Sequence, residues 1–350
     1  MYSLKILLNF LKNTGYGLLL YATTIAATEY VYVTNSTDGT VSVIDTSTNL
    51  MTTSITVGIN PKGIAITPNR AHLYTANANN VSVIPTSTNQ VATQIHINGQ
   101  SYGIAITPNG KYAYVTNNSN NTVSVIYTKT NLVIAIIPIG AYPKGIAITP
   151  NGKYAYVANN GDGTITDGMI SVIQISTNQV TTNIKIGTPP QDIAITPDGK
   201  YAYVTTYSAI NIIDTLTNQV INTTTLEGNP YGIAITPNGK YAYATNTNDY
   251  NVHVIDTSTN LVTATVGVGI YPVGIAITPS GRYAYVTNQT DNNVSVIDTR
   301  TNLVTATVTV GNSPFGVAIM PGSNPPASLL KGAVTNADYN RNNWPQKGTQ

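Results

Sequence analysis

Residues 103–117 read GIAITPNGKYAYVTN, and residues 145–159 read GIAITPNGKYAYVAN, which is nearly the same phrase again. With small changes, the phrase starts at seven places, namely Gly63, Gly103, Gly145, Asp192, Gly232, Gly274 and Gly316. The successive intervals are 40, 42, 47, 40, 42 and 42 residues. A period of about 40–45 residues with four short strands per unit is typical of a β-propeller blade. The spacing therefore predicts an all-β protein built as a seven-bladed β-propeller.

Each repeat unit contains four predicted strands with turn residues between them. In one unit these strands are GIAIT (103–107), YAYVTN (112–117), VSVIYT (123–128) and VIAIIPIG (133–140). The first is nearly continuously apolar, which predicts burial on both faces, whereas the last two alternate more clearly, as expected near the rim. Pro108 and Gly110 suit a tight turn between the first two strands, and Asn49 of IDTSTN tolerates a left-handed backbone. We expect four antiparallel strands in every blade.

The two ends of the repeat region are offset by one strand. The chain enters the pattern at YVYVTN (30–35) without an inner strand before it, and leaves at GVAIMP (316–321) without a second strand after it. Joining the C-terminal inner strand to the first three strands completes the seventh blade and removes an open end. We therefore predict a propeller over residues 29–321, closed in this way. Residues 322–350 lack the period and are expected to form a flexible tail.

Composition narrows the classes of function. Charged residues make up 9% of the chain, against about 25% in ordinary soluble domains. A formal net charge of +2 is too small to favour nucleic acid as a partner. The chain has no cysteine, so it has no disulfide and no thiolate ligand or nucleophile. It also contains no HxxH, GxSxG, CxxCH or phosphate-loop pattern, so we expect neither a metal nor a cofactor.

Residues 1–28 differ in character from the repeat. Lys5 and Lys12 precede a mostly apolar run from Gly15 to Ala27 that ends in small residues. This pattern is typical of a secretory leader cleaved near Ala26 or Ala27, with an uncleaved N-terminal anchor as the alternative. The run is shorter than the roughly 20 residues of a membrane span. We expect an extracellular, cell-surface or periplasmic protein, which the N-terminal sequence of the mature chain would test.

The repeated phrases resemble those of a known family. YAYVTN, VSVIDTSTN and GIAITPNG are similar to the repeats of YVTN-type β-propeller proteins, over about residues 29–321. That family includes archaeal surface-layer proteins and exported bacterial propellers. The resemblance therefore implies a seven-bladed ring and an exported location. It implies little about activity, because the matching residues are those that build the blades.

Function is expected where the repeat breaks its own symmetry, because a ligand rarely has seven-fold symmetry. The residue at or before the start of each inner strand should lie at the tunnel mouth, and it varies from blade to blade. Asp192 stands where the other six units have glycine. Aromatic rings, lysines and a carboxylate that converge on a funnel are elements of a binding site, although loop variability without function is the alternative. The predicted ligand-binding residues are Lys62, Tyr102, Lys144, Gln191, Asp192, Tyr231 and Phe315.

These observations favour an exported, monomeric binding or scaffold protein without enzymatic activity. Its partner at the mouth is expected to be a surface protein, a glycan or a small anionic ligand. The alternative is a lactonase-like hydrolase that uses Asp192 and Glu227, which is an analogy at the level of the fold. His72, His96 and His253 fall on predicted blade strands away from the tunnel, where packed or rim positions explain them better than catalysis.

Overall fold

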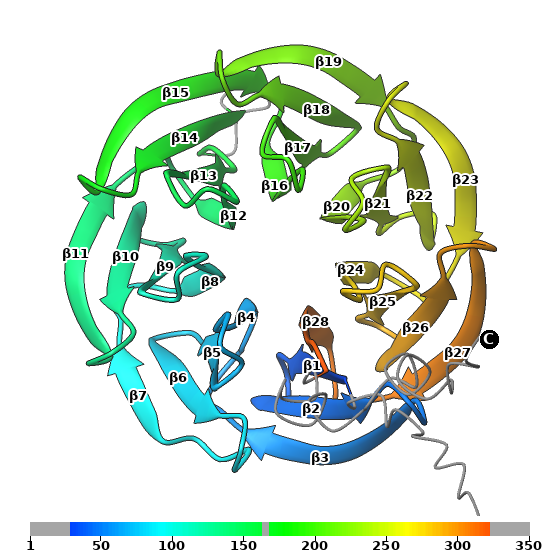
Figure 1. Ribbon diagram of the computed structural model, residues 1–350, viewed down its shortest axis with the longest axis horizontal. Coiled ribbons are helices and arrows are strands. Elements are labelled where there is room, and N and C mark those ends of the chain that lie inside the picture. Colours follow the sequence, from blue (N-terminus) through cyan, green and yellow to red (C-terminus); the bar gives the residue numbers. More distant parts are fainter. Residues whose placement is uncertain (1–28, 163–167, 323–350) are drawn as a thin grey trace, which may run out of the picture. The chain divides into compact units, whose positions relative to one another are not determined.

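The computed structural model describes residues 29–162 and 168–322. In these ranges all regular elements are strands, and they form seven four-stranded antiparallel sheets set around a ring (Figure 1). This confirms the predicted all-β, seven-bladed propeller. The predicted leader (1–28) and nearly all of the predicted tail (323–350) lie outside the described residues. Within the ranges described, no helix has the length and apolarity needed to cross a bilayer.

Each blade runs from an inner strand at the tunnel to an outer strand at the rim, and we number the blades along the chain. Blade 1 consists of β28 (Pro314–Met320), β1 (Tyr30–Asn35), β2 (Thr40–Asp45) and β3 (Leu50–Thr56). Blade 2 consists of β4 (Ile64–Ile66), β5 (His72–Ala76), β6 (Asn80–Pro85) and β7 (Thr93–His96). Blade 3 consists of β8 (Ser101–Ile106), β9 (Tyr112–Asn117), β10 (Thr122–Tyr127) and β11 (Leu132–Pro138). Blade 4 consists of β12 (Pro143–Ile148), β13 (Tyr154–Asn159), β14 (Gly168–Gln174) and β15 (Gln179–Gly187).

The remaining three blades follow the same order. Blade 5 consists of β16 (Pro190–Ile195), β17 (Tyr201–Thr206), β18 (Ala209–Asp214) and β19 (Gln219–Thr225). Blade 6 consists of β20 (Pro230–Ile235), β21 (Tyr241–Asn246), β22 (Asn251–Asp256) and β23 (Leu261–Gly267). Blade 7 consists of β24 (Pro272–Ile277), β25 (Tyr283–Asn288), β26 (Asn293–Asp298) and β27 (Leu303–Thr309).

Blade 1 joins the two ends of the repeat region. The C-terminal strand β28 pairs antiparallel with β1, so that Tyr30 lies opposite Met320 and Val33 opposite Val317. Chain segments far apart in sequence therefore share one sheet (Figure 1). The predicted closure of the ring by the C-terminal inner strand is confirmed.

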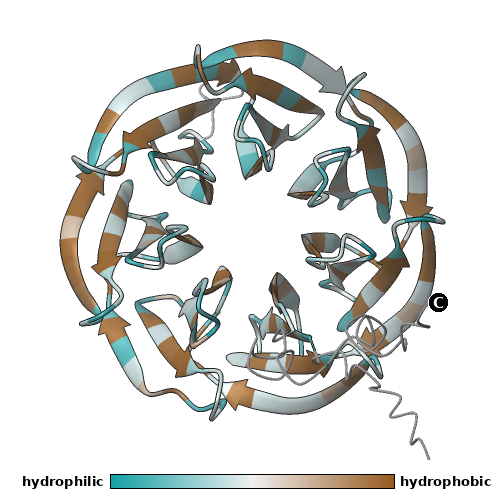
Figure 2. Cartoon of the chain, in the orientation of Figure 1, coloured by the Kyte–Doolittle hydropathy of each residue, from teal (hydrophilic) through white to brown (hydrophobic). Residues whose placement is uncertain are grey.

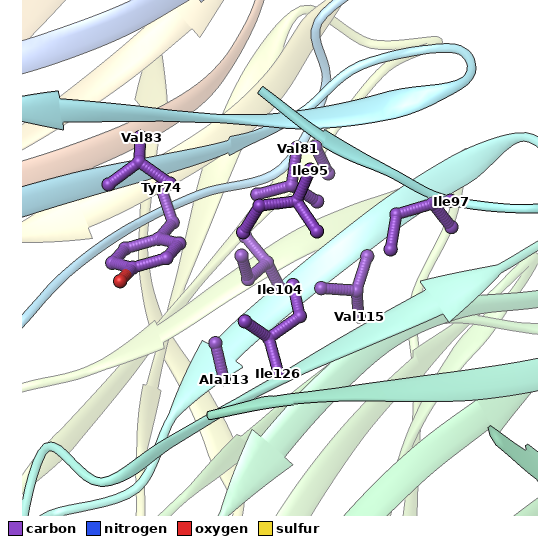
Figure 3. Packing of buried hydrophobic residues seen from close by; sticks show 10 residues of the cluster. Tyr74, Val81, Val83, Ile95, Ile97, Ile104, Ala113, Val115 and Ile126 are labelled. Carbon is purple, nitrogen blue, oxygen red and sulfur yellow. The ribbon is translucent and has the colours of Figure 1, made fainter. Parts of the chain in front are cut away.

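The hydrophobic core lies between neighbouring blades. One cluster combines Tyr74 of β5 and Val83 of β6 with Ile104 of β8 and Val115 of β9 (Figure 3). The second and third strands, such as β9 and β10, are almost wholly buried, whereas outermost strands such as β3 and β27 are mostly exposed and mix apolar with polar residues (Figure 2). The expectation that the inner strand is buried on both faces is wrong in part. Several residues of β8 are only half-buried, because an inner strand borders the open tunnel.

The repeated tyrosine and asparagine connect each blade to the next one. The Tyr156 hydroxyl of blade 4 donates to Asn218 Oδ1 of blade 5 at 2.6 Å, and Tyr285 of blade 7 donates to Asn49 of blade 1 at 3.1 Å. Each accepting asparagine sits in the turn between the outer two strands with a left-handed backbone, as predicted for Asn49 (φ 54°). The complete set of pairs is Tyr32–Asn89, Tyr74–Asn131, Tyr114–Asn178, Tyr156–Asn218, Tyr203–Asn260, Tyr243–Asn302 and Tyr285–Asn49. The repetition thus builds inter-blade contacts as well as blades.

Candidate functional site

The tunnel mouth is shaped by the glycine that follows the mouth residue in six of the seven blades. A Cβ atom on Gly232 would overlap the carbonyl oxygen of Val273 in the next blade, and one on Gly316 would overlap that of Lys62. At these two junctions the absence of a side chain lets the neighbouring inner strands approach closely. Thr245 Oγ1 reinforces the junction, because it accepts a bond from Gly232 N–H and donates one to Val273 O, both at 2.8 Å. The residue before each glycine is therefore held firmly at the mouth.

A cavity of about 160 Å³ opens at this level. Six of the seven predicted binding residues line it, namely Lys62, Tyr102, Gln191, Asp192, Tyr231 and Phe315. The seventh, Lys144, reaches the cavity wall indirectly, since its Nζ donates to Gln191 Oε1 at 2.7 Å. The fold therefore brings all seven predicted residues together, although these residues belong to six different blades.

The aromatic residues meet across the tunnel. The hydroxyls of Tyr102 in blade 3 and Tyr231 in blade 6 are hydrogen-bonded to each other, although these blades are not neighbours. Phe315 lies edge-on to both rings, with centroid distances of 5.6 Å and 6.0 Å. Burial raises the pKa of both phenols, so they stay neutral at physiological pH. The three rings therefore form one cluster at the mouth.

Two lysines carry the positive charge of the mouth. Lys62 Nζ lies 4.2 Å from the centroid of the Tyr102 ring and 5.3 Å from that of Phe315. Burial lowers the pKa of Lys62, and burial together with the charge of Lys62 lowers the pKa of Lys144 to about 8. Neither lysine takes part in any ion pair within residues 29–162 and 168–322. Gln191 is 2% exposed, and its Nε2 has no hydrogen-bond acceptor.

Asp192 lies on the tunnel wall between blades 4 and 6. Its carboxylate accepts bonds from Ile193 N–H at 2.9 Å and Ile233 N–H at 3.3 Å. Burial raises the pKa of this carboxyl to about 6, although both hydrogen bonds act in the opposite direction. The side chain packs against Gly145 of blade 4, where an added Cβ would clash with it. Asp192 is the only carboxylate among the described residues that line the cavity, and Glu227 lies outside this lining.

A second departure from the repeat occurs at the same junction. In five of the other six blades a threonine of the second strand donates to the backbone carbonyl of the next mouth residue, as Thr116 does to Lys144 O at 2.8 Å. Blade 4 has Ala158 at this position, so no hydroxyl can donate to the Gln191 carbonyl. Sequence reasoning missed Ala158, although comparison of the seven YVTN phrases would have revealed it.

Sequence reasoning also missed three exposed tyrosines on the face of the propeller that carries the mouth. Tyr142 and Tyr271 directly precede the prolines that begin β12 and β24, and their φ angles are 50° and 58°. Tyr250, in the loop before β22 of blade 6, has φ of 54°. Left-handed backbone is uncommon for bulky residues and often marks functional surfaces. The other residues with positive φ at the equivalent positions are asparagine, serine or glycine, namely Asn60 and Ser313 for the first pair and Gly39, Asn121 and Asn292 for Tyr250. Aligning the loops of the repeat would have identified these substitutions.

Comparison with known proteins gives a family and several similar structures. The model of a family described as YNCE-like β-propeller matches residues 18–324. Hydrazine synthase of Kuenenia stuttgartiensis is 25% identical with a TM-score of 0.71, over 81% of this chain and 99% of that one. A functionally unknown protein of Desulfotomaculum acetoxidans is 19% identical with a TM-score of 0.74, over 84% and 99% of the two chains.

A further similar structure carries the name of an enzyme. A protein of Bacteroides uniformis, provisionally named a 6-phosphogluconolactonase, is 17% identical with a TM-score of 0.70, over 84% of this chain and 100% of that one. At this identity the likeness concerns the fold alone. No curated protein matches the chain.

Proposed function

The chain belongs to the YNCE-like β-propeller family, and from this premise we propose that it is a non-enzymatic binding protein that holds a small anionic ligand in its tunnel mouth. The observation that carries the proposal is the pair Lys62 and Lys144, two half-buried lysines without an ion pair in the described part of the chain. Burying an ammonium group is costly unless a counter-charge compensates it. An anion bound beside them would supply that compensation. An exported location stays a prediction from residues 1–28.

The charges around the mouth favour a small anion over a polyanion. Asp38, Glu227, Asp249 and Asp291 lie in loops of the same face as the mouth, outside the lining of the cavity. These acids lie in loops next to blades 1, 6 and 7, whereas Lys62 and Lys144 belong to blades 2 and 4. A long polyanion such as a nucleic acid would meet the acidic loops, whereas a compact ligand would reach the lysines. The site therefore suits a ligand with one localised negative group.

Removal of either mouth lysine is expected to weaken anion binding. Lys62→Met should lower the affinity for benzenesulfonate about 10- to 100-fold, the effect of losing a hydrogen bond to a charged group, about 1.5–3 kcal/mol. Lys144→Met should lower it by a smaller factor, because Lys144 acts through its charge and through its hydrogen bond to Gln191. Asp192→Gly should leave the fold intact, because six blades already have glycine there, and should raise the affinity by removing a nearby negative charge. Isothermal titration calorimetry measures all three effects.

Lys153→Met is the matched control, because Lys153 is an exposed lysine in a turn at the opposite end of blade 4. It should bind benzenesulfonate like the unmodified protein. If the two mouth variants also bind unchanged while their thermal unfolding is normal, the anion site lies elsewhere and the proposal is wrong.

Anion affinity is expected to rise in two steps as the pH falls. Lys144, with its pKa lowered to about 8, gains its positive charge below that pH. Asp192, with its pKa raised to about 6, loses its negative charge below that pH. Both changes favour a bound anion, so benzenesulfonate, which keeps its charge throughout, should bind more tightly at pH 7 than at pH 9 and more tightly again at pH 5. Lys144→Met should abolish the upper step and Asp192→Gly the lower one; a flat profile would contradict this assignment.

The lactonase-like alternative depends on Asp192, whose raised pKa would suit a general acid or base. The variant Asp192→Gly distinguishes the two functions. If Asp192 is catalytic, the variant should turn over a lactone substrate several orders of magnitude more slowly than the unmodified protein. If the protein only binds its ligand, neither form should turn over the lactone. Among the described residues, no group of three or more acids and histidines is placed to hold a metal ion for such a reaction.

A further inference from the structure

Two side chains that can donate hydrogen bonds lie at the level of the mouth. Lys62 Nζ lies over the rings of Tyr102 and Phe315, and the buried Gln191 Nε2 has no acceptor. Lys144 uses one of its donors on Gln191 Oε1, which fixes the orientation of that amide. A buried donor without a partner costs about 1–3 kcal/mol. A carboxylate, with two oxygens and about four lone-pair sites, can accept from several such donors together.

Below this level the cavity wall becomes apolar. The residue two positions after each mouth residue lies about 7 Å deeper, given the rise of a strand. At that depth the lining consists of β-branched side chains together with the backbone of the glycines between the two levels. These apolar residues are Ile64, Ile104, Ile146, Ile275 and Val317. The cavity therefore has a polar end, with the Lys62 ammonium group and the Gln191 amide, and an apolar end.

We propose that the ligand of the mouth site is an amphipathic monocarboxylate, whose carboxylate binds Lys62 and Gln191 and whose hydrocarbon part lies against the β-branched wall. This proposal rests on the proposed anion-binding function and specifies the ligand class. Tyr102, Tyr231 and Phe315 add apolar surface beside the same cavity. One molecule would then supply a hydrogen-bond acceptor for Lys62 and Gln191 and a hydrocarbon contact for the apolar wall.

The size and charge of the cavity limit the ligand further. A volume of about 160 Å³ is close to that of an engineered apolar cavity of about 150 Å³ that holds benzene, which corresponds to a hydrocarbon part of about six carbons. A second carboxylate would find no further cationic side chain in the described lining and would lie near Asp192. The cavity therefore suits a ligand with one negative charge and a hydrocarbon part that is a short chain or a single ring.

A homologous series of straight-chain carboxylates at pH 7 tests the proposal. Acetate, butyrate, hexanoate and decanoate should bind with affinity that rises about fourfold per methylene, which corresponds to about 0.8 kcal/mol. The gain should stop near hexanoate, when the cavity is full. Val317→Thr, which adds a hydroxyl to the wall at nearly constant volume, should weaken hexanoate severalfold and leave acetate unchanged. Val304→Thr on the exposed outer strand β27 is the matched control and should change neither.

The outcomes separate this inference from the proposed function. If acetate, hexanoate and inorganic phosphate all bind with affinities that depend on Lys62 but not on chain length, the ligand is a small oxyanion and the amphipathic assignment is wrong. If affinity rises with chain length but Val317→Thr has no effect, the hydrocarbon part lies outside the cavity and the proposed placement is wrong. If no anion binds to the folded protein, the anion-binding function itself is wrong.

Discussion

A chain that ends at Ser313 is expected to lose the closed ring and most of its stability. This truncation removes β28, so β1 loses its inner partner along the register from Tyr30 to Asn35. Val317 and Ile319, which pack on Val31 and Val33 of β1, are lost as well. Each buried backbone group left without a partner costs about 1–3 kcal/mol, and several together approach the total stability of a domain, about 5–15 kcal/mol. Thermal unfolding followed by circular dichroism measures the loss.

A chain that ends at Gly322 is the control for this truncation. It keeps all of β28 and lacks only residues outside the described ranges. Its unfolding temperature should match that of the full chain. Equal unfolding temperatures for the two truncated proteins would mean that closure of the ring contributes nothing to stability.

Gly232→Ala is expected to destabilise the propeller by about 3 kcal/mol, at the upper end of the usual cost of overpacking. The added Cβ would overlap the Val273 carbonyl oxygen, so β20 and β24 would have to move apart. That movement would also strain both hydrogen bonds of Thr245, which join the same two strands. Urea unfolding should show the loss as a lower midpoint with an unchanged slope.

Gly267→Ala provides a matched comparison within the same blade. Gly267 ends the outer strand β23, and no atom lies within 4 Å of where its Cβ would be. This substitution should change stability by less than about 0.5 kcal/mol. If both alanine variants unfold alike, the inner strands are not held at the distance that glycine permits.

Much of the architecture follows from the local pattern of the repeat. A period near 42 residues with four alternating segments fixes the strands, and the one-strand offset between residues 30 and 321 fixes how the ring closes. The inner strand was predicted less well, because its near-continuous apolar run gives no sign that one side borders a tunnel. In a repeat protein each unit contacts mainly its neighbours, so a local pattern determines most of the fold.

The predicted site residues follow from the same pattern, but their contacts do not. Symmetry breaking identified the mouth positions, and ring closure alone makes them converge. The sequence by itself therefore determined the ring, its closure and the list of residues at its mouth. Only the tertiary structure decided that Tyr102 and Tyr231, 129 residues apart, meet across the tunnel, that Lys144 binds Gln191, and that one amide nitrogen stays without an acceptor. The reason is that contacts across a ring depend on its radius and on side-chain rotamers, which no spacing along the chain encodes.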